Sequence, residues 1–165
     1  MAKSTATRAL QLLVREGVAH EVHEYELEVG ADDTTYGEQV AAALGREPER
    51  LYKTLVADLQ TGKGRESVVA IVPVSGLLDL KALAKAAGAK KAEMADPSAA
   101  ERLTGYVTGG ISPFGQLRPL RIFADETLEL WETICVSAGR RGLQVELEPA
   151  ELLRLCEATI ADLSR

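Results

Sequence analysis

A glycine-rich loop holds the residues of this sequence best suited to bind a substrate through main-chain atoms. Residues 109–115 read Gly-Gly-Ile-Ser-Pro-Phe-Gly. Glycine lets the backbone approach a ligand closely and adopt positive φ, and Pro113 stiffens the segment. Such a loop can direct N–H groups at a developing oxyanion without any catalytic side chain. Glycine-proline loops are also common as tight turns, and this alternative stays open.

Positive charge for such a site could come from one lysine or from a pair of arginines. Lys53 begins an otherwise apolar stretch, so it either reaches solvent or lines a cleft. In a cleft it would supply a fixed charge for a phosphate, a ribose or an oxyanion. Arg140 and Arg141 lie in a turn between two expected strands, where they are either solvated or contact phosphate at a pocket rim.

An activated nucleophile or a metal centre is not indicated by any pattern in the sequence. His20 and His23 fall in one expected strand, where residues three apart point to opposite faces and would not share a metal ion. Cys135 and Cys156 are expected far from any histidine or helix start that could activate a thiol. We therefore expect no metal, no other cofactor and no cysteine nucleophile.

Composition predicts one globular domain over residues 1–165. Hydrophobic residues make up 46% and charged residues 27% of the 165 residues. The absence of a secretory signal, of a membrane-spanning stretch and of disulfide spacing predicts a cytoplasmic protein without a membrane partner. A net charge of -6 argues against binding nucleic acid by bulk electrostatics. Residues 76–121 nevertheless hold seven Lys or Arg against four Asp or Glu, which permits a side that faces phosphate.

The elements that must position these residues follow from hydrophobic periodicity and from turn and capping residues. Helices are expected near 6–14 with Ser4 as N-cap, near 37–44, after Asp79, after Asp96-Pro97 and from Pro149; strands near 20–25, 51–59, 68–72, 120–124, 133–137 and 143–147; and a loop at 30–33. The stretch 68–72 is apolar at every position, as in a central strand. Because several strands join by short turns, the pattern favours a mixed-sheet α/β domain.

Six segments, in this order, resemble the YbaK/EbsC family, and the similarity spans nearly the whole chain. They are Tyr52-Lys-Thr-Leu55, Leu78-Asp-Leu-Lys81, Gly88-Ala-Lys-Lys91, Glu93-Met-Ala-Asp-Pro97, Thr104-Gly-Tyr106 and the loop 109–115, and Arg141-Gly-Leu143 extends the match. The family is related to the editing domain of bacterial prolyl-tRNA synthetase. The resemblance implies a mixed, partly barrel-like β-sheet surrounded by helices.

The resemblance also implies an activity: deacylation of mischarged aminoacyl-tRNA, chiefly Cys-tRNA(Pro), by cleavage that the substrate assists. In the family mechanism the thiol of the substrate attacks the aminoacyl ester and forms a cyclic thiolactone, which explains why no enzyme nucleophile is evident. The partners implied are the acceptor end of aminoacyl-tRNA and prolyl-tRNA synthetase, which could supply RNA affinity to an acidic protein. Two alternatives are a non-catalytic module that binds aminoacyl-tRNA or a synthetase, and a regulator, although no DNA-reading element is visible.

Carried across by position, the resemblance assigns roles to individual residues. The essential family lysine falls on Lys53, with Thr54 beside it, and a main-chain catalytic role falls on Gly110. Substrate-binding positions fall on the residues Tyr25, Tyr36, Thr54, Gly109, Ile111, Ser112, Pro113, Gly115, Arg141 and Gln144. Many relatives have Asp where Gln144 stands, so this chain lacks a charge at that position.

Overall fold

A computed structural model describes residues 6–27 and 36–165 of the chain. In chain order the elements are α1 (Arg8–Arg15), β1 (Glu21–Glu24), α2 (Tyr36–Leu44), η1 (Pro48–Arg50), β2 (Tyr52–Thr61), β3 (Gly64–Pro73), α3 (Leu80–Ala87), β4 (Lys91–Met94), α4 (Pro97–Thr104), β5 (Ile122–Asp125), η2 (Glu126–Leu130), β6 (Ile134–Arg140), β7 (Leu143–Leu147), α5 (Pro149–Cys156) and β8 (Thr159–Ala161). No helix in the described ranges is both long and apolar enough to cross a membrane.

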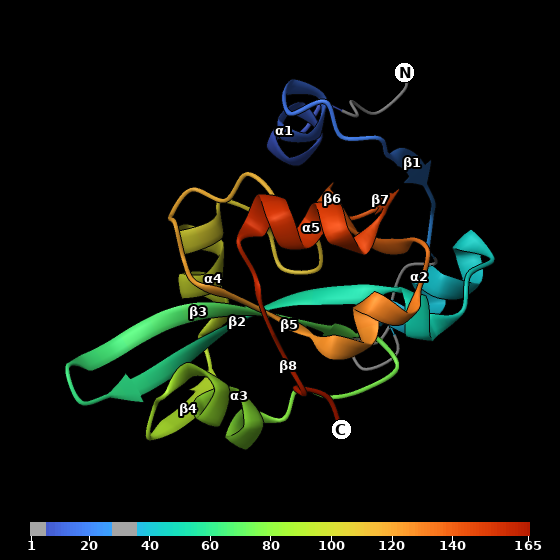
Figure 1. The fold of residues 1–165 in the computed structure, drawn as a ribbon. Helices are drawn as coiled ribbons and strands as arrows, with labels where there is room; N and C mark the ends of the chain where they lie inside the picture. The colour runs from blue at the N-terminus through green and yellow to red at the C-terminus, as the bar shows by residue number, and fades with distance from the viewer. Residues whose placement is uncertain (1–5, 28–35) are drawn as a thin grey trace.

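Two sheets form the framework (Figure 1). The larger sheet has the order β4-β2-β3-β5-β8, with antiparallel pairing of β2 to β3 and β4 and parallel pairing of β3 to β5 and β5 to β8. The smaller sheet is antiparallel, with the order β1-β7-β6. An isolated bridge between Leu51 and Cys135 links the two sheets at one point. Because the larger sheet contains both parallel and antiparallel pairs, the expected mixed sheet is confirmed. The two sheets do not close into a barrel.

Two cores lie on opposite faces of the larger sheet. Val69 and Ile71 of β3 face a core shared with the smaller sheet and with α1, α4 and α5, whereas Val68 and Ala70 face a core closed by α3. In Figure 1, α3 and β4 accordingly lie below the β2–β3 hairpin, with α5 and the smaller sheet above it. The run 68–72 is therefore apolar at every position because both faces of this central strand are buried.

Local sequence signals explain most helix boundaries. The Asp79 side chain accepts from Ala82 N–H and caps α3, which ends at Gly88 in the left-handed conformation. At α1 the N-cap is Thr7, whose hydroxyl accepts from Leu10 N–H. The predicted cap Ser4 and the predicted loop 30–33 lie outside the described residues.

Three short elements were not expected from the sequence: β4, η2 and β8. β4 and β8 are the edge strands of the larger sheet, and each has only three or four residues. A strand this short carries little periodicity of its own, so its pairing depends on the neighbouring strand already in place.

Candidate active site

A cavity of about 350 Å³ opens beside the first half of β2, on the side of the smaller sheet. It is lined by Tyr36, Gly37, Val40, Leu51, Tyr52, Lys53, Thr54, Leu55, Val56, Val74, Met94, Ala95, Pro97, Ala100, Thr108, Gly109, Ile111, Ser137, Arg141 and Gln144. Seven of the predicted site residues are in this set, and they come from β2, α2, the loop after α4, and the β6–β7 hairpin. Among the lining residues that the structure describes there is no histidine, cysteine or carboxylate.

Lys53 is a half-buried cation in the lining of the cavity. On the strand, its neighbours Tyr52 and Thr54 are buried, whereas Lys53 itself is partly exposed. Its Nζ donates to the carbonyl oxygen of Gly76, 2.9 Å away. Burial lowers the pKa of Lys53, since the charged form loses solvation. Lys53 therefore lies in the cavity lining, while its ammonium is bonded to Gly76, which is outside the lining, and its role in a cleft stays a prediction.

Tyr36 and Arg141 form one wall of the cavity. The guanidinium carbon of Arg141 lies 5.0 Å from the centre of the Tyr36 ring, and Arg141 Nε donates to Thr108 O at 3.0 Å. Burial first, and then the hydrogen bond with Tyr25, raise the pKa of Tyr36, whose hydroxyl lies 3.3 Å from the Tyr25 hydroxyl. Tyr25 is therefore a second layer behind Tyr36 and is not among the lining residues.

The first half of the glycine-rich loop reaches the cavity, through Gly109 and Ile111. Gly109 has φ +89°, and a Cβ there would lie 2.4 Å from Arg141 Nε, so a side chain would displace the arginine. Gly110 is packed against the β6–β7 turn, where a Cβ would lie 2.7 Å from Arg140 Cα. Its N–H donates to Val107 O at 2.9 Å and is thus already engaged.

The second half of the loop turns away from the cavity. Ser112, Pro113 and Gly115 are not lining residues, and Ser112 and Pro113 are buried. Gly115 O accepts from Arg8 Nε at 3.0 Å, which fixes this half of the loop to α1. Tyr106 also fixes this half of the loop, because its hydroxyl donates a hydrogen bond to Phe114 O at 2.5 Å. Ser112, Pro113 and Gly115 therefore lie outside the cavity lining, and their substrate-binding role stays a prediction.

Thr54 and Gln144 bring polar atoms into the cavity wall from opposite sheets. Both side chains are about 7% exposed, and Thr54 Oγ1 and Gln144 Oε1 have no hydrogen-bond partner. Gln144 lies on β7 opposite Ser137 of β6, which also lines the cavity. Gln144 therefore belongs to the cavity lining, and its role stays open.

Several lining residues were missed by sequence reasoning, among them Gly37, Val74 and Thr108. Thr108 directly precedes the glycine-rich loop, so its proximity was a usable signal. Gly37 and Val74 gave no such signal, because they are far apart in the sequence and become neighbours only in the folded protein. A Cβ on Gly37 would lie 2.5 Å from Val74 Cβ. The glycine lets α2 approach the end of β3 and close that side of the cavity.

A second cluster of polar residues lies on the smaller sheet, at Glu146 of β7. Its Oε1 accepts from His23 Nε2 at 2.8 Å and from Arg46 at 3.0 Å. Its Oε2 accepts from Arg50 at 3.0 Å and from the Thr133 hydroxyl at 2.5 Å. Burial alone would raise the pKa of Glu146, but the hydrogen bonds from Thr133, His23 and Arg46 and the Arg46 charge lower it to about 2.

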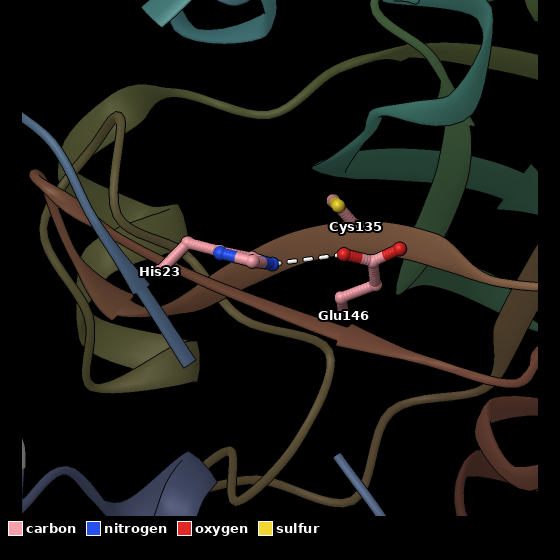
Figure 2. Close-up of side chains that lie close together, drawn as sticks. All are labelled: His23, Cys135 and Glu146. Carbon is pink, nitrogen blue, oxygen red and sulfur yellow. Dashed lines mark hydrogen bonds and ion pairs between the residues drawn. The ribbon is translucent and has the colours of Figure 1, made fainter. Parts of the chain in front are cut away.

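The ligand atoms of His23, Cys135 and Glu146 lie within 4.8 Å of one another. Figure 2 shows the three side chains, with a dashed line for the contact between His23 and Glu146. The expectation that Cys135 lies far from any histidine is therefore wrong, because β1 and β6 both pair with β7. Burial raises the pKa of the Cys135 thiol to about 12, so the thiol stays protonated. Two guanidinium groups already bind the carboxylate and would repel a cation, which favours a structural ion-pair network over a metal centre.

Comparison with known proteins places this geometry in a family. Residues 32–155 match the family model described as "Aminoacyl-tRNA editing domain". The "Putative Cys-tRNA(Pro)/Cys-tRNA(Cys) deacylase EbsC" of Enterococcus faecalis is 37% identical over 96% of this chain and 93% of its own length. The "Multifunctional Ser/Thr-tRNA deacylase ProXp-y" of Escherichia coli K12 is 32% identical over 100% of this chain and 97% of its own length.

A solved structure extends the likeness to three dimensions. It is described as "a putative trans-editing enzyme for prolyl tRNA synthetase" and superposes with a TM-score of 0.82 at 27% identity. The superposition covers 100% of this chain and 99% of the other. In sequence and in fold, this chain belongs to the family of aminoacyl-tRNA editing domains.

Proposed function

We propose that residues 1–165 act as one trans-editing deacylase, which hydrolyses the ester bond of mischarged aminoacyl-tRNA with Cys-tRNA(Pro) as the main substrate. One relative is named for deacylation of Cys-tRNA(Pro) and Cys-tRNA(Cys) and another for Ser/Thr-tRNA. The observation that carries the proposal is that Lys53 and the start of the glycine-rich loop line one cavity. A cavity of about 350 Å³ is large enough for the aminoacyl end of a tRNA.

The reaction proceeds without an enzyme nucleophile. The thiol of the bound cysteinyl group attacks its own ester carbonyl, so that a C–S bond forms, the C–O bond to the ribose breaks, and the thiol proton passes to the ribose hydroxyl. The products are free tRNA and a cysteine thiolactone, which water then opens to cysteine. The enzyme contributes by orienting the substrate and by stabilising the charge that develops on the carbonyl oxygen.

Lys53 is the group that stabilises this charge, and Gly109 and Ile111 hold the aminoacyl ester beside it. Gly110 acts through the turn that its hydrogen bond to Val107 closes, because its N–H is not available to an oxyanion. Arg141, exposed at the cavity wall, contacts a phosphate of the acceptor end.

The location of the reaction follows from its substrate. Charged tRNA is a cytoplasmic molecule, so we place the protein in the cytoplasm. Since its net charge of -6 opposes tRNA binding, prolyl-tRNA synthetase is the protein partner that would raise the affinity.

Multiple-turnover deacylation of labelled Cys-tRNA(Pro) by catalytic amounts of protein tests the proposal. The Lys53→Ala variant should lower kcat/KM by roughly a hundredfold, the loss typical of removing one group that stabilises an oxyanion. Lys63→Ala is the matched control, because Lys63 is an exposed lysine in the β2–β3 turn, and this variant should retain wild-type activity. Equal rates for Lys53→Ala and wild type would refute the lysine assignment. Release that does not exceed the uncatalysed rate would identify a binding module in place of an enzyme.

A further inference from the structure

A fully buried carboxylate lies outside the cavity lining, at the end of β5. It belongs to Asp125, which accepts four hydrogen bonds, all from uncharged groups. Its Oδ1 accepts from the N–H groups of Leu163 and Ser164, at 2.8 and 3.0 Å. Its Oδ2 accepts from the N–H and the hydroxyl of Thr127, at 3.3 and 2.5 Å. These bonds offset the lost solvation of the carboxylate, and they tie it to two separate segments of the chain.

The first segment connects Asp125 to the ammonium of Lys53. Residues 163–165 form a short antiparallel ladder with residues 77–79, through three main-chain hydrogen bonds of 2.7–3.0 Å. Figure 1 shows the stretch between β3 and α3 beside the last residues of the chain. Gly76 directly precedes this ladder, and its carbonyl oxygen accepts from Lys53 Nζ at 2.9 Å. The carboxylate therefore fixes the segment to which the ammonium is bonded.

The second segment connects Asp125 to the residue next to Lys53. The Thr127 hydroxyl, which donates to Asp125, lies 2.9 Å from the Tyr52 hydroxyl. Since a hydroxyl has one hydrogen to donate, Thr127 accepts from Tyr52. Tyr52 and Lys53 are neighbours on β2, and both line the cavity. Two separate paths from one buried carboxylate thus converge on adjacent residues of the lining.

We propose that Asp125 is a positioning residue, which holds Lys53 and Tyr52 in place at the cavity through these two paths. This inference rests on the proposed function, in which Lys53 stabilises the charge on the ester carbonyl oxygen. The ammonium has three hydrogens, so two remain for the substrate while one stays on Gly76. Without Asp125 the anchoring segment is released and the ammonium shifts. A catalytic group that is misplaced by about 1 Å can cost about a hundredfold in rate.

A double-mutant cycle tests whether Asp125 acts through Lys53. Single-turnover deacylation of Cys-tRNA(Pro), at several protein concentrations in excess of substrate, gives the maximal rate and the half-saturating concentration. Asp125→Ala should lower the maximal rate at least about tenfold and leave half-saturation unchanged, because the lysine acts in the transition state. In the Lys53→Ala background the same change should lower the rate less than about twofold, since the group that Asp125 positions is already gone.

Three further variants separate positioning from stability, at a temperature where urea unfolding shows each protein to be folded. Asp125→Asn keeps an oxygen that accepts from the main-chain N–H groups of residues 163–164, so it should recover most of the rate. Glu146→Gln is the matched control, because it breaks buried ion pairs on the smaller sheet, outside both paths, and should show no coupling to Lys53. If Asp125→Ala does not fold, Thr127→Val replaces it in the cycle, since it keeps the side-chain shape and removes the hydroxyl of the second path.

Two results would overturn the inference: a wild-type rate for Asp125→Ala, or equal slowing by this change with and without Lys53. Either would limit the carboxylate to a role in stability and leave the proposed function intact. Failure of the proposed function looks different, because Lys53→Ala would then react as fast as wild type, or wild type itself would not exceed the uncatalysed rate. Both of these outcomes would also remove the positioning role.

Discussion

Replacing Glu146 by Gln should remove the charge at the centre of the ion-pair network on the smaller sheet. The carboxylate accepts from His23, Arg46, Arg50 and Thr133, and its side chain is 8% exposed. The variant leaves two guanidinium groups without their anion and presents an amide N–H to groups that are themselves donors. We therefore expect a folded but less stable protein.

The size of the loss follows from the pKa of Glu146, which falls from 4.5 to about 2 in the folded state. A shift of this size corresponds to about 3 kcal/mol of free energy of unfolding. Because the folded-state pKa is the lower one, this contribution is present above the unfolded pKa and is lost as pH falls toward about 2. By pH 3, about 2 kcal/mol of it should be gone.

Urea unfolding of wild type and Glu146→Gln at pH 7 and at intervals down to pH 3 measures this contribution. The gap between the two proteins should be about 3 kcal/mol at pH 7 and should narrow steadily below pH 4.5. Glu151→Gln is the control, since Glu151 pairs with Arg154 on an exposed helix face and should contribute less than about 1 kcal/mol. A gap that is absent at pH 7, or that keeps its full size at pH 3, would show that the network is not held by the charge of Glu146.

Two further predictions concern buried hydrogen bonds outside the cavity lining. Asp125→Ala should lower the free energy of unfolding by about 3 kcal/mol, because the buried carboxylate accepts from the main-chain N–H groups of residues 163–164. Thermal unfolding of this variant and of the exposed control Asp162→Ala measures the loss, and equal stability of the two variants would contradict the prediction. Tyr106→Phe leaves the carbonyl oxygen of Phe114 unpaired, so it should lower the free energy of unfolding by about 1–3 kcal/mol and should also lower the deacylation rate. If urea unfolding gives the wild-type free energy, other contacts hold the glycine-rich loop.

The fold was predictable wherever one strand or helix carries its own signal. The run at 68–72 and the cap at Asp79 identified β3 and α3 because burial and capping act on neighbouring residues. The edge strands β4 and β8 were not predictable, since three or four residues acquire their conformation from the strand beside them. The same reason hides the approach of Cys135 to His23, which depends on the pairing of two strands with a third.

The candidate site divides in the same way. Lys53 and the glycine-rich loop stand out by residue type, and both reach the cavity. Within the loop, Gly109 and Ile111 line the cavity, whereas Gly115 is hydrogen-bonded to Arg8 of α1. This division was not predictable, because it depends on contacts between residues more than a hundred positions apart in the sequence. The sequence could not predict that Thr54 Oγ1 and Gln144 Oε1 lack hydrogen-bond partners, because this depends on how the two sheets pack.

The contact between Lys53 and the Gly76 carbonyl has a consequence for the entropy of binding. A free lysine side chain samples many rotamers, and freezing it on a ligand consumes binding free energy. Here the ammonium is already anchored before any ligand arrives, and the anchoring segment is itself fixed, since Leu77 exchanges two main-chain hydrogen bonds with Arg165. In the proposed reaction, the oxyanion would therefore meet a cation whose position was fixed during folding.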